Sequence, residues 1–214
     1  MMRWKKISDA VVRRLPLYLR VLEEAYQSGE VKLMSSHELG ERAGVSPALV
    51  RKDLAWFGEF GKQGVGYEVS YLREELRKIL NLDREIRIAL VGVGSLGHAL
   101  VRYNQQRYKD DTHFNLHIVA LFDNDPSKVR THLDGLYIYP MEALSQVAKE
   151  EHLQMAIVAV PAPAAQQVVD RCVEAGIKAI LNFAPAKLVV PPGVHLANAD
   201  VSLEMQRLAY YLSE

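Results

Sequence analysis

The stretch from Ile86 to Gly97 constrains the fold more than any other part of the chain. It reads Ile-Arg-Ile-Ala-Leu-Val-Gly-Val-Gly-Ser-Leu-Gly, an apolar, β-prone run that ends in a Gly-x-Gly-x-x-Gly pattern. In dinucleotide-binding folds such glycines have separate tasks: Gly92 would allow a tight turn, Gly94 the approach of backbone to a pyrophosphate, and Gly97 close packing of helix on strand. A helix starting here would also offer free N–H groups to phosphates. The stretch therefore predicts the first strand and phosphate-binding turn of a nucleotide-binding domain.

Three glycines at this spacing are a weak signal by themselves, but the residues that follow them support the interpretation. A helical pattern runs to about Gln106, and a polar loop follows over 107–113. A second apolar strand, Leu116 to Phe122, then ends in Asp123, 26 residues after the last glycine. An acid at this place binds the ribose hydroxyls of NAD and repels the extra phosphate of NADP. Asp125 is an alternative, although it would more naturally cap a following helix.

Strands and helices alternate through the rest of this region, which is typical of a doubly wound parallel sheet in an α/β fold. The expected strands cover residues 137–139, 155–160, 179–182 and 194–197, and the expected helices cover 141–150 and 164–175. The segment Asn182-Phe-Ala-Pro185 would lie at the carboxyl edge of the sheet, where such folds bind ligands.

The chain ends in a short helix that Asp200 or Ser202 would cap. Its apolar residues form one stripe: Met205, Leu208, Ala209 and Leu212. A helix this short is marginal in water alone, so the stripe must be buried on its own domain or on a partner chain.

The first part of the chain predicts several helices. Apolar residues recur at helical spacing from Ser8 to Gly29, and Pro16 allows either one kinked helix or a helix that begins near Leu15. Ser35 and Glu38 form the capping box of a short helix that Gly44 ends. Ser46 is a good N-cap and Pro47 a good first residue for the next helix, which we expect to reach Phe57.

Two short helices joined by a tight turn predict a helix-turn-helix, whose second helix enters the major groove of DNA. Five residues of that helix would remain accessible to bases and phosphates: Ser46, Pro47, Ala48, Arg51 and Lys52. The alternative is that Arg51 and Lys52 belong only to a solvated surface.

A glycine-rich segment, Gly58 to Tyr67, follows this helix and predicts a β-hairpin wing whose second strand continues to Ser70. Lys62 and Gly64 at its tip could lie close to a phosphate backbone or in the minor groove. A plain flexible loop is the competing interpretation. A helix from Tyr71 to Leu80 would close this domain, and residues 81–85 would be a linker.

Composition and charge are consistent with a folded protein that has one nucleic-acid-facing part. Hydrophobic residues make up 49% of the 214 residues, which suffices for a buried core. The first 62 residues carry 11 Lys and Arg against 8 Asp and Glu, whereas the others carry 15 against 18. No run is apolar enough to span a membrane and no apolar signal segment opens the chain, so we expect a cytoplasmic location.

Residues typical of catalytic sites are not arranged for catalysis. The seven histidines are scattered without metal-ligand spacing or an evident acid partner, and the chain lacks a Gly-x-x-x-x-Gly-Lys phosphate loop. The single cysteine, Cys172, falls in a helical apolar pattern and is expected to be a packed thiol. We therefore expect a nucleotide pocket without catalytic residues and without a metal, and not an enzyme.

Five motifs together make the chain similar to the Rex family of redox-sensing transcriptional repressors. They are Val50-Arg-Lys-Asp-Leu54, Phe57-Gly-x-x-Gly-x-x-Gly-Val-Gly-Tyr67, Gly92-Val-Gly-Ser-Leu-Gly97, Phe122-Asp123 and Ala175-Gly-Ile-Lys-Ala-Ile-Leu-Asn-Phe-Ala-Pro185. The resemblance implies a winged-helix domain over 1–81, a Rossmann-like domain over 82–199 and a C-terminal helix over 200–214. It further implies a homodimer in which this helix is exchanged onto the partner. Such a protein binds palindromic, double-stranded operator DNA when apo or NAD-bound and releases it when NADH binds.

The resemblance also assigns roles to residues. Those implied to hold the adenosine and pyrophosphate are Gly92, Val93, Gly94, Ser95, Leu96, Gly97 and Asp123. Those implied to lie near the nicotinamide are Tyr103, Val160, Pro161, Phe183, Ala184 and Pro185. DNA contact is implied for Arg51, Lys52, Lys62 and Gly64, while Gln63 is polar where some relatives carry a second basic wing residue.

A conformational switch would join Asp200 to Arg20 in one state and to Tyr103 in the other. The alternative is that Asp200 only caps a helix and Arg20 is only a surface charge. Two other functions remain open at this point: a small NAD(H)-dependent oxidoreductase whose first domain aids assembly, and a regulator that responds to CoA or another nucleotide.

Overall fold

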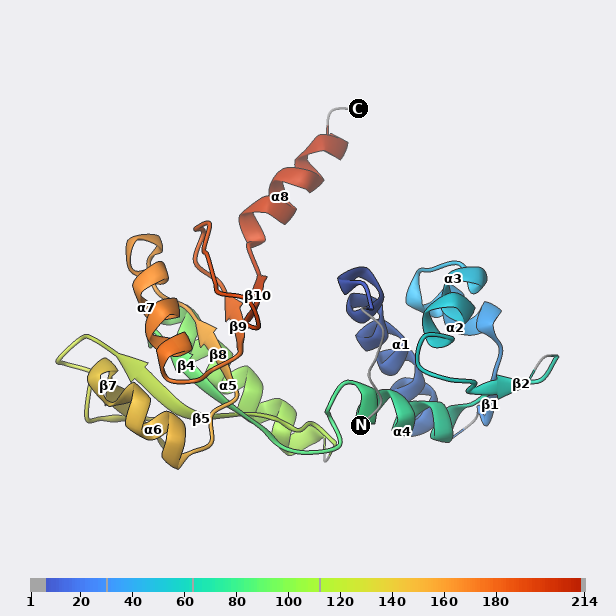
Figure 1. Ribbon diagram of the computed structural model, residues 1–214, viewed down its shortest axis with the longest axis horizontal. Helices are drawn as coiled ribbons and strands as arrows, with labels where there is room; N and C mark the ends of the chain where they lie inside the picture. Colours follow the sequence, from blue (N-terminus) through green and yellow to red (C-terminus); the bar gives the residue numbers. More distant parts are fainter. Residues whose placement is uncertain (1–6, 30, 63, 112, 213–214) are drawn as a thin grey trace. The chain divides into compact units, whose positions relative to one another are not determined.

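A computed structural model describes residues 7–29, 31–62, 64–111 and 113–212 of the chain (Figure 1). These residues form two compact units, one ending at Arg84 and the other beginning at Glu85. The boundary expected from the sequence follows residue 81, close to this division. Because each unit has its own core, each is described by itself.

The first unit consists of helices around a small antiparallel sheet. Its helices are α1 (Asp9–Ser28), α2 (Ser36–Ala43), α3 (Pro47–Leu54) and α4 (Val69–Ile79), and its strands are β1 (Leu33–Met34), β2 (Gly61–Lys62) and β3 (Gly66–Glu68), in the order β1-β3-β2. The sheet and the helices enclose one apolar core, whose largest fully buried side chains include Tyr18, Leu22, Met34 and Leu72. This is the winged-helix arrangement that the sequence predicts.

Helix α1 is a single helix that contains Pro16, which decides between the two alternatives left by the sequence. Ser8 precedes it in extended conformation, and Gly29 ends it with a φ of 69°, a left-handed conformation that favours glycine.

Helices α2 and α3 begin as their capping residues predict. The Ser35 hydroxyl accepts the backbone N–H of Glu38 over 3.1 Å, and the Ser46 hydroxyl accepts the N–H of Leu49 over 3.3 Å. The prediction for the end of α3 was wrong, because the helix stops at Leu54 and residues 55–57 form a turn. Capping chemistry marks where a helix begins more clearly than where it ends.

The glycine-rich segment is a β-hairpin, as predicted. Gly61 pairs with Tyr67 and Lys62 with Gly66 in antiparallel register. The second strand ends at Glu68, since α4 begins at Val69 and not at Tyr71, so the predicted extension to Ser70 was wrong. Strand β1 was not predicted, because two residues carry no alternation to recognise. Gln63 lies outside the described residues.

The second unit is built on one sheet with the order β10-β9-β8-β4-β5-β7-β6. Every neighbouring pair is parallel except β6 and β7. The strands are β4 (Ile86–Val91), β5 (Leu116–Asp123), β6 (His132–Leu133), β7 (Leu136–Pro140), β8 (Met155–Val158), β9 (Ala179–Asn182) and β10 (His195–Asn198). The chain builds outward from β4 on one side and then crosses to β8 on the other. The expected doubly wound sheet is confirmed, and its switch point lies between β4 and β8.

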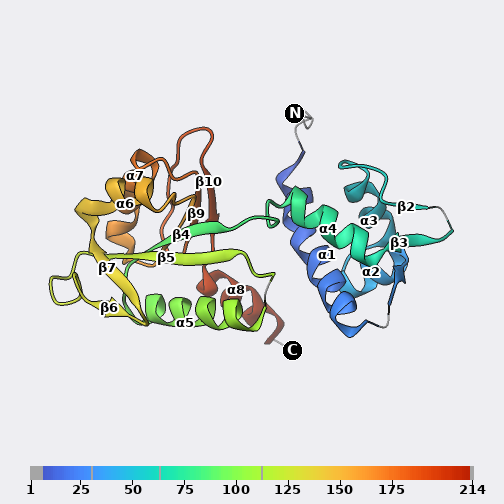
Figure 2. The ribbon, with the colours of Figure 1, turned by 90° about the horizontal axis from the view of Figure 1, so that it is seen from below.

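Helices cover both faces of this sheet (Figure 2). Helix α5 (Ser95–Asp110) lies on one face, and α6 (Leu144–Glu150) and α7 (Ala162–Glu174) lie on the other. Along β4, Ile88 and Leu90 belong to the core under α5, whereas Ala89 and Val91 belong to the core under α6 and α7. Because successive side chains of β4 enter cores on opposite faces of the sheet, residues 88–91 are apolar without interruption, as expected for a strand buried on both faces.

Several element boundaries in this unit were predicted wrongly. Helix α5 continues to Asp110, through half of the expected loop, and β8 ends at Val158. Residues 126–130 form turns where a helix after Asp125 was expected. They lead into β6, which was not predicted and which pairs with β7, the strand expected over 137–139. The helix expected over 141–150 begins as a 3-10 turn, η1 (Met141–Ala143), and α7 starts at Ala162.

The last helix is α8 (Val201–Ala209), followed by the 3-10 turn η2 (Tyr210–Leu212). The Asp200 carboxylate accepts the backbone N–H of Ser202 over 2.9 Å and is therefore the cap. All the side chains from 201 to 212 are exposed in the single chain, including the whole predicted stripe. Within one chain, the stripe is not buried on its own domain.

Candidate functional site

The three glycines after β4 occupy three different environments. Gly92 has a φ of 98°, and a Cβ there would lie 2.5 Å from the carbonyl oxygen of Ala159. A Cβ on Gly97 would lie 2.2 Å from the carbonyl oxygen of Gly92. By contrast, a Cβ on Gly94 would meet nothing within 4 Å. Gly92 and Gly97 are required by the packing of the turn, whereas the space beside Gly94 is open to a ligand.

Helix α5 begins at this open space. No side chain caps its first turn, in which Ser95 and Leu96 are exposed. The first N–H groups of a helix have no partner within the helix and carry its positive dipole end. Val93 differs from its neighbours because its side chain is buried in the core under α5, so only its backbone faces the turn. This arrangement suits a phosphate group.

Asp123, at the end of β5, is fixed beside the same turn. Its Oδ2 accepts the backbone N–H of Val93 over 2.8 Å, and its Oδ1 accepts the N–H of Asp125 over 2.8 Å. Lys128 Nζ lies 3.5 Å from Oδ2. A carboxylate has about four lone-pair sites, so Asp123 can still accept hydroxyl groups of a sugar.

Asp125, the alternative acid, is used within its own turn. Its Oδ1 accepts both the backbone N–H and the hydroxyl of Ser127, and these hydrogen bonds keep its pKa below the ordinary value. Of the two acids, Asp123 is the one that contacts the glycine turn.

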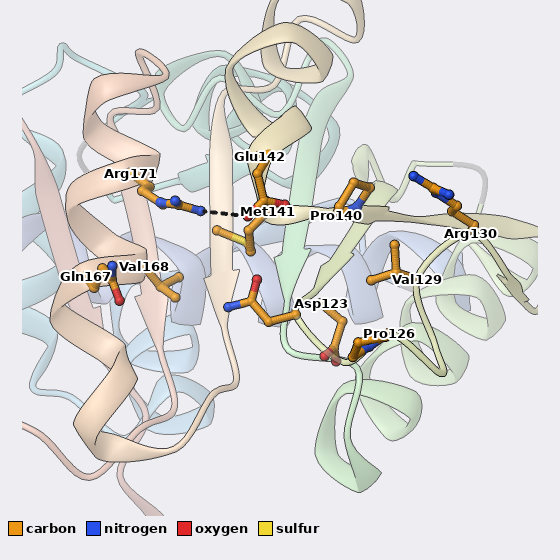
Figure 3. Close-up of a pocket in the computed structure, with 11 residues that line it drawn as sticks. Asp123, Pro126, Val129, Arg130, Pro140, Met141, Glu142, Gln167, Val168 and Arg171 are labelled. Atoms are coloured by element: carbon orange, nitrogen blue, oxygen red, sulfur yellow. Dashed lines mark ion pairs between the residues drawn. The ribbon is translucent and has the colours of Figure 1, made fainter.

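A pocket of about 490 Å³ opens next to Asp123 (Figure 3). Its walls come from the ends of β5 and β7 and from one side of α7. Arg130 and Arg171 lie at opposite sides of it, and Arg171 Nη1 is 3.9 Å from Glu142 Oε1. Apart from Asp123, none of its lining residues was predicted from the sequence to belong to a site: Asn124, Pro126, Val129, Arg130, Pro140, Met141, Glu142, Gln167, Val168 and Arg171. Asn124 and Met141 directly follow strands and could have been found that way, whereas nothing in the sequence marks the residues of α7.

Two loops expected near a nicotinamide leave the sheet side by side. Val160 and Pro161 follow β8, and Phe183 to Pro185 follow the neighbouring β9. The Val160 side chain also packs against Gly92, where its Cγ1 would lie 2.9 Å from an added Cβ. The structure therefore brings the first loop to the glycine turn, at the carboxyl ends of β4, β8 and β9.

The buried Asn182 organises the second of these loops. Its side-chain amide donates to the carbonyl oxygen of Ala184 over 2.9 Å and to Asn198 Oδ1 over 3.0 Å, and its Oδ1 accepts the Ala184 N–H over 2.9 Å. These bonds fix the backbone that carries Phe183 and Pro185. The sequence placed Asn182 at the ligand-binding edge of the sheet, but its hydrogen bonds to the loop become evident only from its burial in the structure.

The three residues of the expected switch lie on different elements. Tyr103 is on α5 with 63% of its surface exposed. Asp200 caps α8, and its hydrogen bond with Ser202 lowers its pKa. Arg20 is an exposed residue of α1 in the first unit. The role of Asp200 as the cap of α8 is confirmed, and its pairing with Arg20 and Tyr103 stays a prediction.

The helix-turn-helix and the wing share one concave surface in the first unit. A pocket of about 760 Å³ lies between α3 and the hairpin, lined among others by Ser36, Arg51, Lys62, Gly64 and Tyr67. Arg51 Nη1 donates to the Ser36 hydroxyl over 2.8 Å, which orients the guanidinium from the start of α2. This surface joins the helix residues to Lys62 and Gly64 of the wing.

The N-terminal part of α3 is accessible. Ser46, Ala48, Arg51 and Lys52 are exposed and Pro47 is partly exposed. Arg and exposed backbone N–H groups here are suited to bases and phosphates.

Neither a metal centre nor a reactive thiol is found in the described part of the chain. No group of three or more His, Cys, Asp or Glu there could hold a metal ion. Burial raises the pKa of the Cys172 thiol to about 12, as expected for a packed cysteine. No described helix is long and apolar enough to cross a membrane.

Two family models match the two units. Residues 6–55 match a putative DNA-binding protein N-terminus, and residues 83–186 match a CoA binding domain. The chain is 49% identical over 213 residues to the redox-sensing transcriptional repressor Rex of Brevibacillus brevis, with 100% of both chains covered. It is 44% identical to the repressor of the same name of Roseiflexus sp., with 99% of this chain and 93% of the relative covered.

Solved structures of a Rex-family repressor called RSP are also similar over nearly the whole chain. The structure with β-NAD+ and operator DNA has a TM-score of 0.87 at 36% identity, and covers 97% of this chain and 93% of RSP. The structure with β-NADH has a TM-score of 0.83 at 34% identity, with 97% and 95% covered.

Proposed function

This chain belongs to the Rex family of redox-sensing transcriptional repressors, and we propose that it binds operator DNA when apo or NAD-bound and releases it on binding NADH. One observation carries the proposal: a chain with an accessible helix-turn-helix also holds Asp123 against an open glycine turn, over a 2.8 Å bond from Val93. The family is one of regulators and not of enzymes. A repressor of chromosomal genes acts in the cytoplasm, which is the location we propose.

The nucleotide would be held in three parts along the carboxyl edge of the sheet. We assign the pyrophosphate to the backbone from Gly92 to Gly97, because Gly94 is open and the first turn of α5 is uncapped. The adenosine ribose is assigned to Asp123, and the nicotinamide to the loops after β8 and β9, together with Tyr103. NAD and NADH, which differ in ring charge and by one hydride, share the first two contacts, so discrimination must arise at the third.

Operator DNA would be read by α3 and the wing. Arg51 and Lys52, with Ser46, Pro47 and Ala48, would lie in the major groove, and Lys62 and Gly64 would contact the backbone or the minor groove. We propose a homodimer formed through the C-terminal helix, because the apolar stripe of α8 is exposed on a single chain and needs a partner. Two recognition helices related by two-fold symmetry then fit a palindromic site.

A ligand shifts such an equilibrium only through its different affinities for the two states. Moving a population from mostly DNA-bound to mostly released takes a preference of roughly 10⁴-fold, which two coupled subunits can share. We propose that Asp200 pairs with Arg20 in one state and with Tyr103 in the other. Operator affinity of Asp200→Ala with and without NADH tests this, and undiminished release by NADH would place the switch elsewhere.

The function itself is tested by titrating operator DNA at one fixed salt concentration, because phosphate contacts make affinity depend strongly on salt. The titration is repeated across NADH to NAD ratios, and once with CoA in place of both, since the second unit also matches a CoA binding domain. We expect release with rising NADH and none with CoA. Release by CoA alone, or sustained oxidation of NADH by a simple carbonyl substrate, would overturn the proposal.

A further inference from the structure

The recognition helix α3 carries a buried acid. Asp53 has only 1% of its surface exposed, although its neighbours Arg51 and Lys52 are exposed. It lies in the last turn of α3, where the negative end of the helix dipole disfavours a carboxylate. An acid at such a position needs compensation from outside its own helix.

That compensation comes from α1. Arg14 Nε donates to Asp53 Oδ2 over 2.6 Å and Arg14 Nη2 donates to Oδ1 over 2.8 Å, so the guanidinium binds both oxygens of the carboxylate. The Tyr18 hydroxyl donates to Oδ2 over 2.7 Å. Arg14 and Tyr18 are four residues apart and therefore share one face of α1.

The hydrogen-bonded group of Asp53, Arg14 and Tyr18 fixes the position of α3 on α1 more than it adds to the stability of the fold. Desolvation opposes ionisation of Asp53, but the hydrogen bonds from Arg14 and Tyr18 hold its pKa below the ordinary value, so it is charged at neutral pH. A buried ion pair is weak evidence for net stability, because desolvation offsets its attraction. A bidentate pair, however, allows little rotation or sliding of one helix along the other, whereas apolar side chains can repack.

We propose that Asp53 is a positioning residue that locks the recognition helix to α1, so that operator specificity and its loss on NADH binding both depend on this clamp. Through it, α1 presents Arg51 and Lys52 in one orientation, and a displacement of α1 is passed directly to α3. The inference rests on the proposed function and adds the route within the first unit by which a change at α1, which also carries Arg20, reaches the DNA.

The test compares the full-length wild type with Asp53→Asn, Arg14→Lys, Tyr18→Phe and a control, Asp9→Asn, which removes an exposed ion pair with Arg13 on the same helix. Fluorescence anisotropy measures affinity for operator and for unrelated DNA, with and without NADH. Thermal unfolding and NADH affinity are measured on every variant. Arg14→Lys keeps the charge but loses the two-pronged geometry.

For Asp53→Asn and Arg14→Lys we expect the ratio of operator to unrelated-DNA affinity to fall at least tenfold, and the effect of NADH on operator binding to shrink. Affinity for unrelated DNA and for NADH should stay within about twofold of the wild type. Tyr18→Phe keeps the ion pair, so its ratio of operator to unrelated-DNA affinity should lie between those of these two variants and that of the control. If Asp53 served stability alone, the variants would have a lower unfolding temperature, but the ratio of operator to unrelated-DNA affinity and the effect of NADH on operator binding would not change.

The proposal is overturned if folded Asp53→Asn or Arg14→Lys keeps the wild-type specificity ratio and the wild-type response to NADH. If Asp53→Asn does not fold, Arg14→Lys and Tyr18→Phe decide by the same ratios. Failure of the proposed function would look different, because the wild type and Asp9→Asn would then also fail to release operator with NADH.

Discussion

Val93 donates its backbone N–H to Oδ2 of Asp123 over 2.8 Å, which ties the glycine turn after β4 to the end of β5. The neighbouring pairing of Val91 with Phe122 places the two residues there, and the Gly92 N–H donates to the Phe122 carbonyl oxygen over 2.8 Å. The acid proposed for the ribose therefore does not move independently of the turn proposed for the pyrophosphate. The two proposed contacts therefore belong to one hydrogen-bonded site.

Replacing Asp123 by Asn should weaken discrimination against NADPH. The amide keeps one oxygen to accept the Val93 N–H but loses the negative charge that repels a 2′-phosphate, while Lys128 remains nearby. We expect the ratio of NADPH to NADH dissociation constants to fall roughly tenfold, which corresponds to about 1.4 kcal/mol. Intrinsic NADH fluorescence in the bound state measures both constants. Asp125→Asn is the matched control, and an equal change in that variant would contradict the assignment of the ribose to Asp123.

Alanine substitutions at two of the glycines should separate binding from folding. Gly94→Ala adds a methyl group to open space, so the free energy of unfolding of the ligand-free protein should stay within about 0.5 kcal/mol of the wild-type value. The affinity for NADH should fall, because the methyl group occupies the space proposed for the pyrophosphate. Gly97→Ala places the methyl group 2.2 Å from the Gly92 carbonyl oxygen, so it should lower the unfolding temperature itself. Calorimetry and NADH titration of both variants provide the measurements. If Gly94→Ala bound NADH with wild-type affinity, the assignment of the pyrophosphate to this turn would be contradicted.

The fold was predictable where one local signal decides the structure. Capping residues such as Ser35 and Ser46 fix helix starts by side-chain hydrogen bonds to nearby N–H groups, and β4 is recognisable because both its faces are buried. The ends of α3 and α5 were not predictable, since a helix continues as long as tertiary packing covers it. The strands β1 and β6 have only two residues each and are too short to show an alternating pattern of their own.

The candidate site was predictable only for groups that follow strands or belong to a motif. Asp123 and the glycines could be named because the carboxyl ends of parallel strands meet at one edge. The pocket wall formed by Gln167, Val168 and Arg171 could not, because those residues look like any other helix surface. For the same reason, Asp53 appeared only as part of a motif, and its buried pair with Arg14 required the three-dimensional structure.

Cys172 should be unreactive in the folded protein. Its thiol is fully buried and burial raises its pKa to about 12, so almost no thiolate is present at neutral pH. We expect an aromatic disulfide reagent to label the chain only after unfolding in guanidinium, and Cys172→Ala to retain the NADH response. Rapid labelling of the native protein, or loss of NADH response in the alanine variant, would assign the thiol a part in redox sensing.

A charge in the apolar stripe of α8 should dissociate the proposed dimer. Leu208→Asp places a carboxylate where 55% of an apolar side chain is exposed on the single chain, and burial of that charge against a partner is unfavourable. Gln206→Asp introduces the same charge at a polar position of the same helix and is the control. Sedimentation velocity should show a monomer for the first variant and a dimer for the second. A dimer in both cases would place the interface elsewhere.

The clamp between Asp53 and Arg14 should make the stability of the first unit depend on acid pH. Because the pKa of folded Asp53 lies below the unfolded value of 3.8, its contribution is complete above that value and is lost as the pH falls through the folded pKa. At pH 7, Asp53→Asn should cost roughly 3 kcal/mol, as expected for breaking a buried pair. Trp56 belongs to the first unit and the sequence after Arg84 contains no tryptophan, so Trp56 fluorescence reports the unfolding of the first unit. The difference in unfolding temperature between wild type and Asp53→Asn should be large at pH 7 and should shrink as the pH is lowered below about 4. The exposed control Asp9→Asn should differ little from the wild type at either pH. A difference for Asp53→Asn that stays constant over this range would mean that lost packing, and not the carboxylate charge, accounts for the effect.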